Sequence, residues 1–407
     1  MLPAQSVSDD LRINNYRDIF GFGDGGLNVG EPLTNCVRCP RPDSAIIHAK
    51  RTQREIHMGK GQRRHEQNLP RIRPPTPVVG VKSLLDVMQD GREYQSIVSA
   101  VVAPGLDLMD EVVRGINAIE QVRSRKCLAY VGNVVRQDAI GSGVDATDDL
   151  PFAEMVSLVP ASERKVDVLV ATNGGSAHQV SRFVNFLRTR FDEVDFLVPS
   201  MCMSAGTLFA LSGDHIWMTK RACLGPIDPQ VPTRDGRYVP AQALVLLVDQ
   251  LQKTGQDALS NRQPVPWSAV RIIDSIDKKE LADAITATNY STQMASQFLL
   301  NYKFRNWATR TDSQTPVTTE YKTNRAGEIA VALASHDKWL SHGHAISRDV
   351  LWEQVRLKID HPTPELERAL VRIWALFNWM FDKAIASKVL ASSDYRYLKY
   401  QTTGEVK

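Results

Sequence analysis

A serine at the start of a short apolar segment is the first candidate for chemistry. In PSMCMSAGTLFALSG, residues 199–213, Ser204 follows an apolar run and precedes the small residues Ala205 and Gly206. A serine in this position can cap a helix, act as a neutral spacer, or attack a carbonyl group from a turn where backbone amides converge. The surrounding residues must decide among these three interpretations.

A pair of glycines occupies an equivalent place one strand and one helix earlier. In VDVLVATNGGSAHQV, Gly174 and Gly175 follow an apolar run, and Ser176 can cap the next helix. Adjacent glycines adopt backbone conformations closed to other residues and leave amides exposed, although such a pair alone is typical of an ordinary turn. Because the carboxyl ends of parallel strands meet at one edge of a sheet, we expect these amides to face Ser204. A hydroxyl facing free amides is the arrangement that acyl transfer needs.

The composition is that of a globular protein. The chain has 407 residues, 43% of them hydrophobic, and a formal net charge of +3, so charge gives no reason to expect nucleic acid or a membrane as the main partner. No window approaches the roughly 18 to 20 apolar residues of a spanning helix. Three of the five cysteines lie in apolar runs, which favours a reducing compartment, and we expect a cytoplasmic protein without a cofactor.

The first 80 residues have little periodic apolar pattern and are interpreted as a basic, partly ordered arm. The arm could contact an acidic partner or RNA, and a solvated basic linker is the favoured alternative. Cys36 and Cys39 have the spacing of half a zinc site, but the other ligands would be His48 and His57 at irregular spacing, so structural zinc is the less favoured interpretation.

The elements that must position the serine lie in residues 81–240. Two helical segments come first, and apolar runs then alternate with helices. Continuous valine, leucine and phenylalanine runs, rather than alternating ones, indicate strands covered on both faces. The predicted strands are CLAYVG at 127–132, VDVLVAT at 166–172 and VDFLVPS at 194–200. The pattern predicts an α/β fold with a parallel sheet and crossover helices.

Residues 241–407 are predicted to form a helical region that completes the site and supports oligomerisation. Its longest predicted helix spans 364–390, and the tail after residue 394 is expected to be solvated. The helix carries more large apolar side chains than one buried stripe requires, which predicts a contact with another subunit of a homo-oligomer. These side chains are Trp374, Phe377, Trp379, Met380 and Phe381.

The two glycine-bearing turns also carry a family resemblance. TNGGSAHQVSRFVNFLR and FLVPSMCMSAGTLFALSGDHIWMTKRACLGPIDPQ resemble the Clp/crotonase superfamily, most closely the serine dehydrogenase proteinase family related to signal peptide peptidase A. The likeness covers roughly 126–355. It implies a spiral core of ββα units, ring formation and hydrolysis of peptide bonds. It further implies Ser204 as the nucleophile and the amides of Gly174, Gly175 and Ala205 as the oxyanion hole. Asn173 departs from the proline of many relatives.

The general base stays open at this point. Where the peptidase ClpP has a histidine, this chain has GPIDPQ, whose Asp228 is a supporting candidate. Relatives similar to signal peptide peptidase A use a lysine, which suggests Lys253 as the base of a Ser-Lys dyad, although an exposed helix-end lysine is the alternative. His178 lies in the first turn after the glycines and could contribute, or be a surface histidine. His342 and His344 are expected to form a loop.

The sequence thus predicts a serine peptidase that acts on a peptide or protein through an acyl-enzyme on Ser204. A catalytically weak, oligomeric peptide-binding scaffold of the same fold is the alternative. Acyl-CoA chemistry of the crotonase type shares the oxyanion hole but leaves the serine unexplained. His215 begins a predicted strand and is expected to be structural, and no metal site is expected among the histidines.

Overall fold

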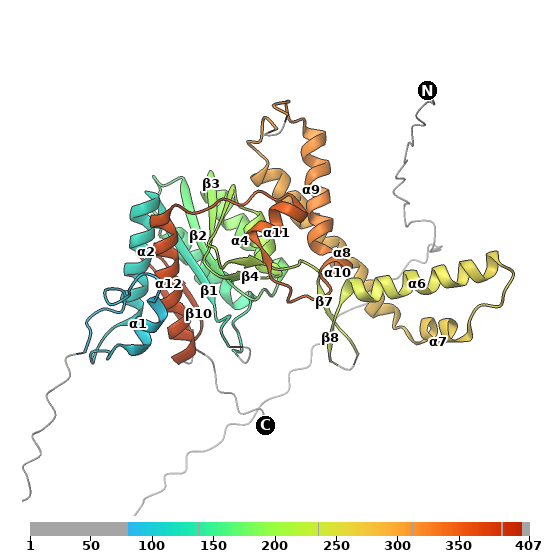
Figure 1. Ribbon diagram of the computed structural model, residues 1–407, viewed down its shortest axis with the longest axis horizontal. Helices are drawn as coiled ribbons and strands as arrows, with labels where there is room; N and C mark the ends of the chain where they lie inside the picture. Colours follow the sequence, from blue (N-terminus) through green and yellow to red (C-terminus); the bar gives the residue numbers. More distant parts are fainter. Residues whose placement is uncertain (1–79, 137–138, 235, 311–312, 384–385, 401–407) are drawn as a thin grey trace, which may run out of the picture. The chain divides into compact units, whose positions relative to one another are not determined.

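The computed structural model describes residues 80–136, 139–234, 236–310, 313–383 and 386–400 (Figure 1). The basic arm predicted for the N-terminus and the Cys36 and Cys39 pair lie outside these residues. None of the helices in the described ranges is both long and apolar enough to cross a membrane.

A six-stranded mixed sheet forms the centre of the fold, with the strand order β11-β10-β1-β2-β3-β5. The four strands β1, β2, β3 and β5 run parallel, and β10 and β11 extend the sheet in antiparallel fashion beyond β1. The bounds are β1 Lys126–Gly132, β2 Lys165–Ala171, β3 Glu193–Val198, β5 His215–Met218, β10 Ala386–Ala391 and β11 Arg396–Tyr400.

Helices cover both faces of this sheet. Along β1, Cys127 and Ala129 pack into an apolar cluster with α2 and α12, whereas Leu128 and Tyr130 pack into a second cluster with α3, α4 and α5. Both faces are therefore buried, which explains the continuous apolar runs and confirms the predicted α/β fold. The bounds are α1 Glu93–Ser99, α2 Leu108–Arg123, α3 Asp149–Ser157, α4 Ala177–Arg190, α5 Ala205–Leu211 and α12 Pro364–Lys383.

The chain between β5 and α12 is mainly helical, and α8 packs against α5, α6 and α9. Its helices are α6 Ala241–Ser260, α7 Trp267–Ser275, α8 Lys278–Phe298, α9 Thr319–Ala334, α10 His336–Trp339 and α11 Arg348–Val350, with π-helical turns η3 Leu299–Lys303 and η4 Leu351–Val355. The 3-10 turn η2 Ala146–Asp148 precedes α3. Two small sheets join β4 Met201–Cys202 to β6 Cys223–Leu224 and β9 Ile346–Ser347, and β7 Gln230–Pro232 to β8 Tyr238–Pro240.

The C-terminal region differs from the sequence prediction. Helix α12 ends at Lys383, and residues 386–391 form the buried strand β10, which pairs with β1 from Ala129↔Ala391 to Gly132↔Lys388. The predicted helix to residue 390 is wrong because buried backbone needs hydrogen-bond partners, and the edge of β1 supplies them. The tail is likewise not wholly solvated, because 396–400 form β11.

The large apolar side chains of α12 mostly pack against other parts of the same chain. Phe377 and Phe381 are 0% exposed, Met380 is 1% exposed, and Trp374 and Trp379 pack partly buried against the same cluster. This helix therefore gives no support to a subunit contact, because its large side chains cover α2 and one face of the sheet.

Candidate active site

Ser204 occupies a strained turn at the start of α5. Strand β3 leads through β4 into Ser204, whose backbone has φ 53° and ψ −118°. The turn is held against the neighbouring strand end, because Thr172 donates from its amide to Met201 O at 3.0 Å and accepts from the Met203 amide at 2.8 Å. The Ser204 side chain makes no capping hydrogen bond to α5. Its hydroxyl is therefore not a helix cap, and positive φ at a residue other than glycine is a form of strain that clusters at functional sites.

The small residues around Ser204 permit this close packing. Gly174 has φ 105°, and a Cβ atom on it would lie 2.6 Å from Ser204 Cβ. A Cβ atom on Gly206 would lie 2.5 Å from Cγ2 of Thr172. Both positions exclude larger residues, so the glycines that the sequence singled out bring the two turns into contact.

Two backbone amides beside Ser204 are uncommitted. The Gly174 amide donates to Thr172 Oγ1 at 3.1 Å, and the Gly174 carbonyl accepts from the Val144 amide at 2.7 Å. The amides of Gly175 and Ala205 make no hydrogen bond among the residues that the structure describes. All three residues of the predicted oxyanion hole thus meet at Ser204, and two of them, Gly175 and Ala205, present free donors in this conformation.

Ser204 lines a cavity of about 730 Å³. The cavity also includes Gly175 and Ala205, and two histidines, His178 and His342, lie on its wall. Strand β7 and helix α8 supply further wall residues, among them Gln230, Val231, Ala287 and Tyr290. The cavity therefore brings a candidate nucleophile, two candidate oxyanion donors and two histidines together.

Of the two histidines on the cavity wall, His342 is the one paired with a carboxylate. Its Nδ1 lies 2.8 Å from Oδ1 of Asp228, whose side chain is only 1% exposed. A histidine beside a carboxylate donates from Nδ1, which leaves the lone pair of Nε2 to accept a proton. On the other side, Asp228 Oδ2 lies 3.6 Å from Nδ1 of His336.

Hydrogen bonds from two helices fix Asp228 in its turn. The amide of Ile227 donates to the carbonyl of Leu333 at 3.0 Å, near the end of α9. Thr207 of α5 accepts from the Gly225 amide at 3.0 Å. The GPIDPQ turn is thus attached to the same helix that begins after Ser204, which couples the carboxylate to the serine turn.

The structure does not bring Lys253 to the serine. Lys253 is exposed on α6 and is not among the residues that line the cavity. His178 does line the cavity, with its ring centroid 4.5 Å from that of Tyr290. The sequence predicts only that His342 lies in a loop. The GPIDPQ segment contains Asp228 and the LSHGHAI segment contains His342, but nothing in the sequence indicates that the two segments are in contact.

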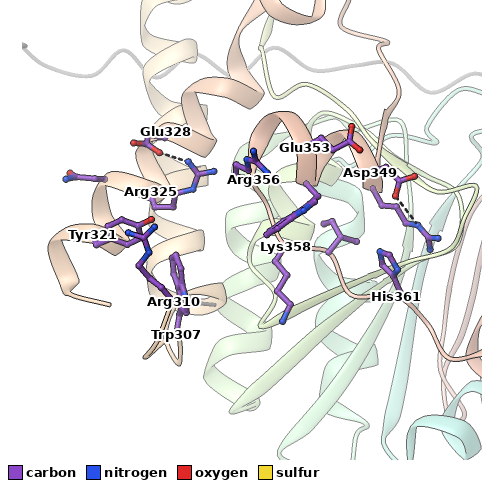
Figure 2. A pocket seen from close by; sticks show the side chains of 14 residues that line it. Trp307, Arg310, Tyr321, Arg325, Glu328, Asp349, Glu353, Arg356, Lys358 and His361 are labelled. Atoms are coloured by element: carbon purple, nitrogen blue, oxygen red, sulfur yellow. Dashed lines mark hydrogen bonds and ion pairs between the residues drawn. The ribbon is translucent and has the colours of Figure 1, made fainter. Parts of the chain in front are cut away.

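A larger cavity of about 1130 Å³ lies between α9 and residues 348–361 (Figure 2). Its lining includes neither Ser204 nor any other serine, threonine or cysteine. It therefore offers no serine, threonine or cysteine nucleophile, and the smaller cavity is the candidate active site. No group of three or more metal-binding side chains occurs in the described part of the chain.

Comparison with known proteins finds a family match and two similar proteins. The family model of the ClpP-like SDH-type serine proteinase matches residues 97–262, a range that contains both glycines and Ser204 and confirms the predicted resemblance. Two uncharacterized proteins of Methanocaldococcus jannaschii are similar to the chain. One is 26% identical over 156 residues, which cover 37% of this chain and 53% of the relative. The other is 23% identical over 165 residues, which cover 39% of this chain and 55% of the relative. The chain spans about half the length of these curated relatives.

Proposed function

We propose that this chain hydrolyses peptide bonds with Ser204 as nucleophile, His342 as general base and Asp228 as the residue that orients the base. The match of residues 97–262 to the ClpP-like SDH-type serine proteinase family supports the reaction class. One observation carries the proposal. Ser204, on a strained turn, lines the same cavity as His342, which is itself paired with a buried carboxylate. Nucleophile, base and orienting group are the three parts that activate a serine.

The reaction follows from these positions. Ser204 Oγ attacks the carbonyl carbon while His342 Nε2 takes its proton, and the oxyanion accepts hydrogen bonds from the Gly175 and Ala205 amides. Collapse of this intermediate breaks the C–N bond, and His342 gives its proton to the leaving amine. Water then attacks the acyl-enzyme and loses a proton to His342. As the ester bond breaks, His342 returns this proton to Ser204 Oγ, and the acid product is released. Asp228 stabilises the imidazolium in both steps.

We also propose that the chain self-associates, through α6 and α7 and not through α12 as the sequence predicts. Helices α6 and α7 carry exposed apolar side chains, with Leu259 70%, Trp267 78% and Ile273 44% exposed. Exposed apolar side chains in such number are typical of an interaction surface. Light scattering over a wide concentration range tests this, and a monomer throughout would contradict it.

A fluorophosphonate probe tests the activity directly, because it reacts with an activated serine hydroxyl. We expect the full chain to be labelled at Ser204, and Ser204→Ala to lose both labelling and turnover of a fluorogenic peptide. Ser157→Ala, which removes an exposed serine of α3, is the matched control and should keep both. Absence of labelling in a folded, assembled sample would contradict the proposal and favour a catalytically inactive scaffold.

A further inference from the structure

The larger cavity combines aromatic rings with an excess of cations. Figure 2 shows side chains of α9 facing those of residues 348–361 across an open space. The rings belong to Trp307, Tyr321 and Trp352. Three carboxylates, those of Glu328, Asp349 and Glu353, line the same space. They are outnumbered by five cations, Arg310, Arg325, Arg348, Arg356 and Lys358. The cavity therefore has a positive balance although its walls carry both signs.

Two of the cations, Arg356 and Lys358, lie on a segment whose alternate residues are buried. Arg356 and Lys358 are exposed, while Leu357 and Ile359, which alternate with them, are 0% and 8% exposed. Arg356 ends η4 in the left-handed region, at φ 59°, and its amide donates to the Trp352 carbonyl at 3.1 Å. The buried alternate residues hold the backbone, so the two cations are presented without extensive reordering on binding.

These two cations also form no close ion pair among the described residues, although Lys358 interacts electrostatically with the Asp360 carboxylate. Glu328 accepts from Arg325 at 2.5 Å, and Asp349 lies 3.9 Å from Nε of Arg348. No ion pair within the described residues involves Arg356 or Lys358, and the Arg356 guanidinium carbon lies 6.0 Å from the Trp352 ring centroid. Trp352 itself is 53% exposed. Two cations that make no close ion pair, beside an exposed ring, suit a ligand that carries both anionic and apolar groups.

The walls favour a polypeptide over a nucleic acid. The carboxylates that line the cavity would repel a continuous phosphate backbone, whereas a polypeptide can match both signs. The backbone amide and carbonyl of Lys358 make no hydrogen bond within the part of the chain that the structure describes, so they are available to a ligand with its own amides. Tryptophan, tyrosine and arginine are also the residues most enriched at the energetic centres of protein interfaces.

We propose that this cavity is an exosite that binds an acidic, extended segment of the substrate polypeptide, an inference that rests on the peptidase function proposed above. Helix α9 connects the two sites, because Tyr321 lines the cavity and Leu333 hydrogen-bonds Ile227 next to Asp228. At 1.5 Å per residue, Tyr321 and Leu333 lie about 18 Å apart along the helix axis. An extended chain covers that distance in about six residues. One polypeptide can therefore reach both sites.

The first experiment measures binding without hydrolysis, in the full chain carrying Ser204→Ala. Fluorescence anisotropy is recorded with a fluorescein-labelled acidic peptide that contains one phenylalanine. We expect Arg356→Glu with Lys358→Glu to weaken binding at least about tenfold, because like charges then face each other across the contact. Trp352→Ala should weaken it too, whereas Lys278→Glu, an exposed change on α8 outside the cavity, should bind as the parent does.

Equal affinity of the charge-reversed variant and the parent would overturn the exosite. Displacement of the peptide by a single-stranded oligonucleotide at a lower concentration than by unlabelled peptide would overturn the choice of ligand class.

The second experiment identifies the source of the acidic segment. A fluorogenic peptide is compared with the same peptide bearing an acidic extension, using the otherwise unchanged chain. The extension should lower KM, and Arg356→Glu with Lys358→Glu should remove that gain while kcat on the unextended peptide and Ser204 labelling persist. Charge-dependent binding with no effect on KM would overturn the substrate assignment in favour of a partner protein. Loss of Ser204 labelling in the unchanged chain would instead refute the peptidase function, so the two failures are distinguishable.

Discussion

Nδ1 of His342 lies 2.8 Å from Oδ1 of Asp228 although the two residues are 114 positions apart in the chain. Asp228 is buried at 1% exposure, and His342 is 28% exposed and lines the cavity that contains Ser204. A buried carboxylate that holds one ring nitrogen fixes the tautomer and turns the other nitrogen into an acceptor. This pair can therefore act as the base and its orienting group.

Replacement of His342 by glutamine should lower kcat by about 10² to 10⁴, the usual contribution of a positioned general base. Asp228→Asn should also lower kcat, because an amide can favour the wrong tautomer of the ring. Turnover of a fluorogenic peptide measures both effects, and thermal unfolding verifies that each variant folds.

The same assay separates His342 from Lys253. Lys253→Arg keeps a charge that cannot be removed, so it would abolish turnover if Lys253 were the base. Because Lys253 is exposed on α6 and does not line the cavity, we expect Lys253→Arg to remain active. An inactive Lys253→Arg together with an active His342→Gln would refute the triad.

Gly174→Ala should reduce turnover at least about a hundredfold, the cost of disturbing an oxyanion site. The added Cβ would lie 2.6 Å from Ser204 Cβ, at a backbone φ of 105° that disfavours alanine. Gly255→Ala is the matched control, because its added Cβ would meet no atom within 4 Å beyond the adjacent helix backbone and the site is inside α6. The control should keep full activity and gain about 0.5–1 kcal/mol in the free energy of unfolding. Similar activity in both variants would contradict the packing role of Gly174.

The parts of the site that local sequence predicts are those built by one strand and its following turn. Gly174 and Gly175 after one apolar run, and Ser204 after the next, indicate two turns at the same sheet edge, and the structure places them in contact. His342 could not be assigned in this way, because its partner Asp228 lies in a distant turn and neither segment has a diagnostic spacing.

Strand β10 could not be predicted from the local sequence for a related reason. Residues 386–391, ASKVLA, continue the composition of α12 and contain a lysine, so they read as the end of an amphipathic helix. In the structure Lys388 is 0% exposed, because carboxylates from the η2 region surround its ammonium group. Only the tertiary partner makes a buried strand lysine acceptable.

Lys388→Met should destabilise the protein by about 3–5 kcal/mol, the usual cost of removing one partner of a buried ion pair. Nζ of Lys388 lies 2.5 Å from Oδ2 of Asp148 and donates to the Gly143 carbonyl at 2.6 Å. The change leaves the buried Asp148 charge with only Lys399, whose Nζ lies 3.9 Å from its Oδ1, as a cationic partner. Urea unfolding measures the loss, and Lys388→Met with Asp148→Asn should recover part of it, because the buried charge is also removed.

Turnover of the double variant shows whether this network also supports the site. Gly143 precedes Val144, which donates to the Gly174 carbonyl at 2.7 Å and accepts from the Ser176 amide at 2.8 Å. Loss of the lysine contact to Gly143 should therefore lower kcat even where stability is partly restored. Full kcat in the double variant would limit Lys388 to a structural role.

Asp167 should make stability depend on pH between about 4 and 6. Asp167 is 0% exposed on β2, and its position is directly opposite Asp195 on β3. Burial raises the pKa of Asp167 from 3.8 to about 6, an effect that ion pairs with Arg123 and Arg125 oppose but do not cancel.

The direction of this pH dependence follows from proton binding in the folded and unfolded chain. Between the unfolded pKa of 3.8 and the folded pKa of about 6, the folded chain retains a proton on Asp167 that the unfolded chain has released. The resulting stabilisation is fully present below the unfolded pKa and is lost as the pH rises through the folded pKa. Two pKa units correspond to at most about 3 kcal/mol.

The original chain should therefore gain stability relative to Asp167→Asn as the pH falls from 7 to 4. Urea unfolding of both at several pH values measures this, with Asp149→Asn as the control, because Arg182 holds the pKa of Asp149 at about 2, below the window. A difference between the original chain and Asp167→Asn that stays constant from pH 7 to 4 would show that Asp167 ionises alike in the folded and unfolded states.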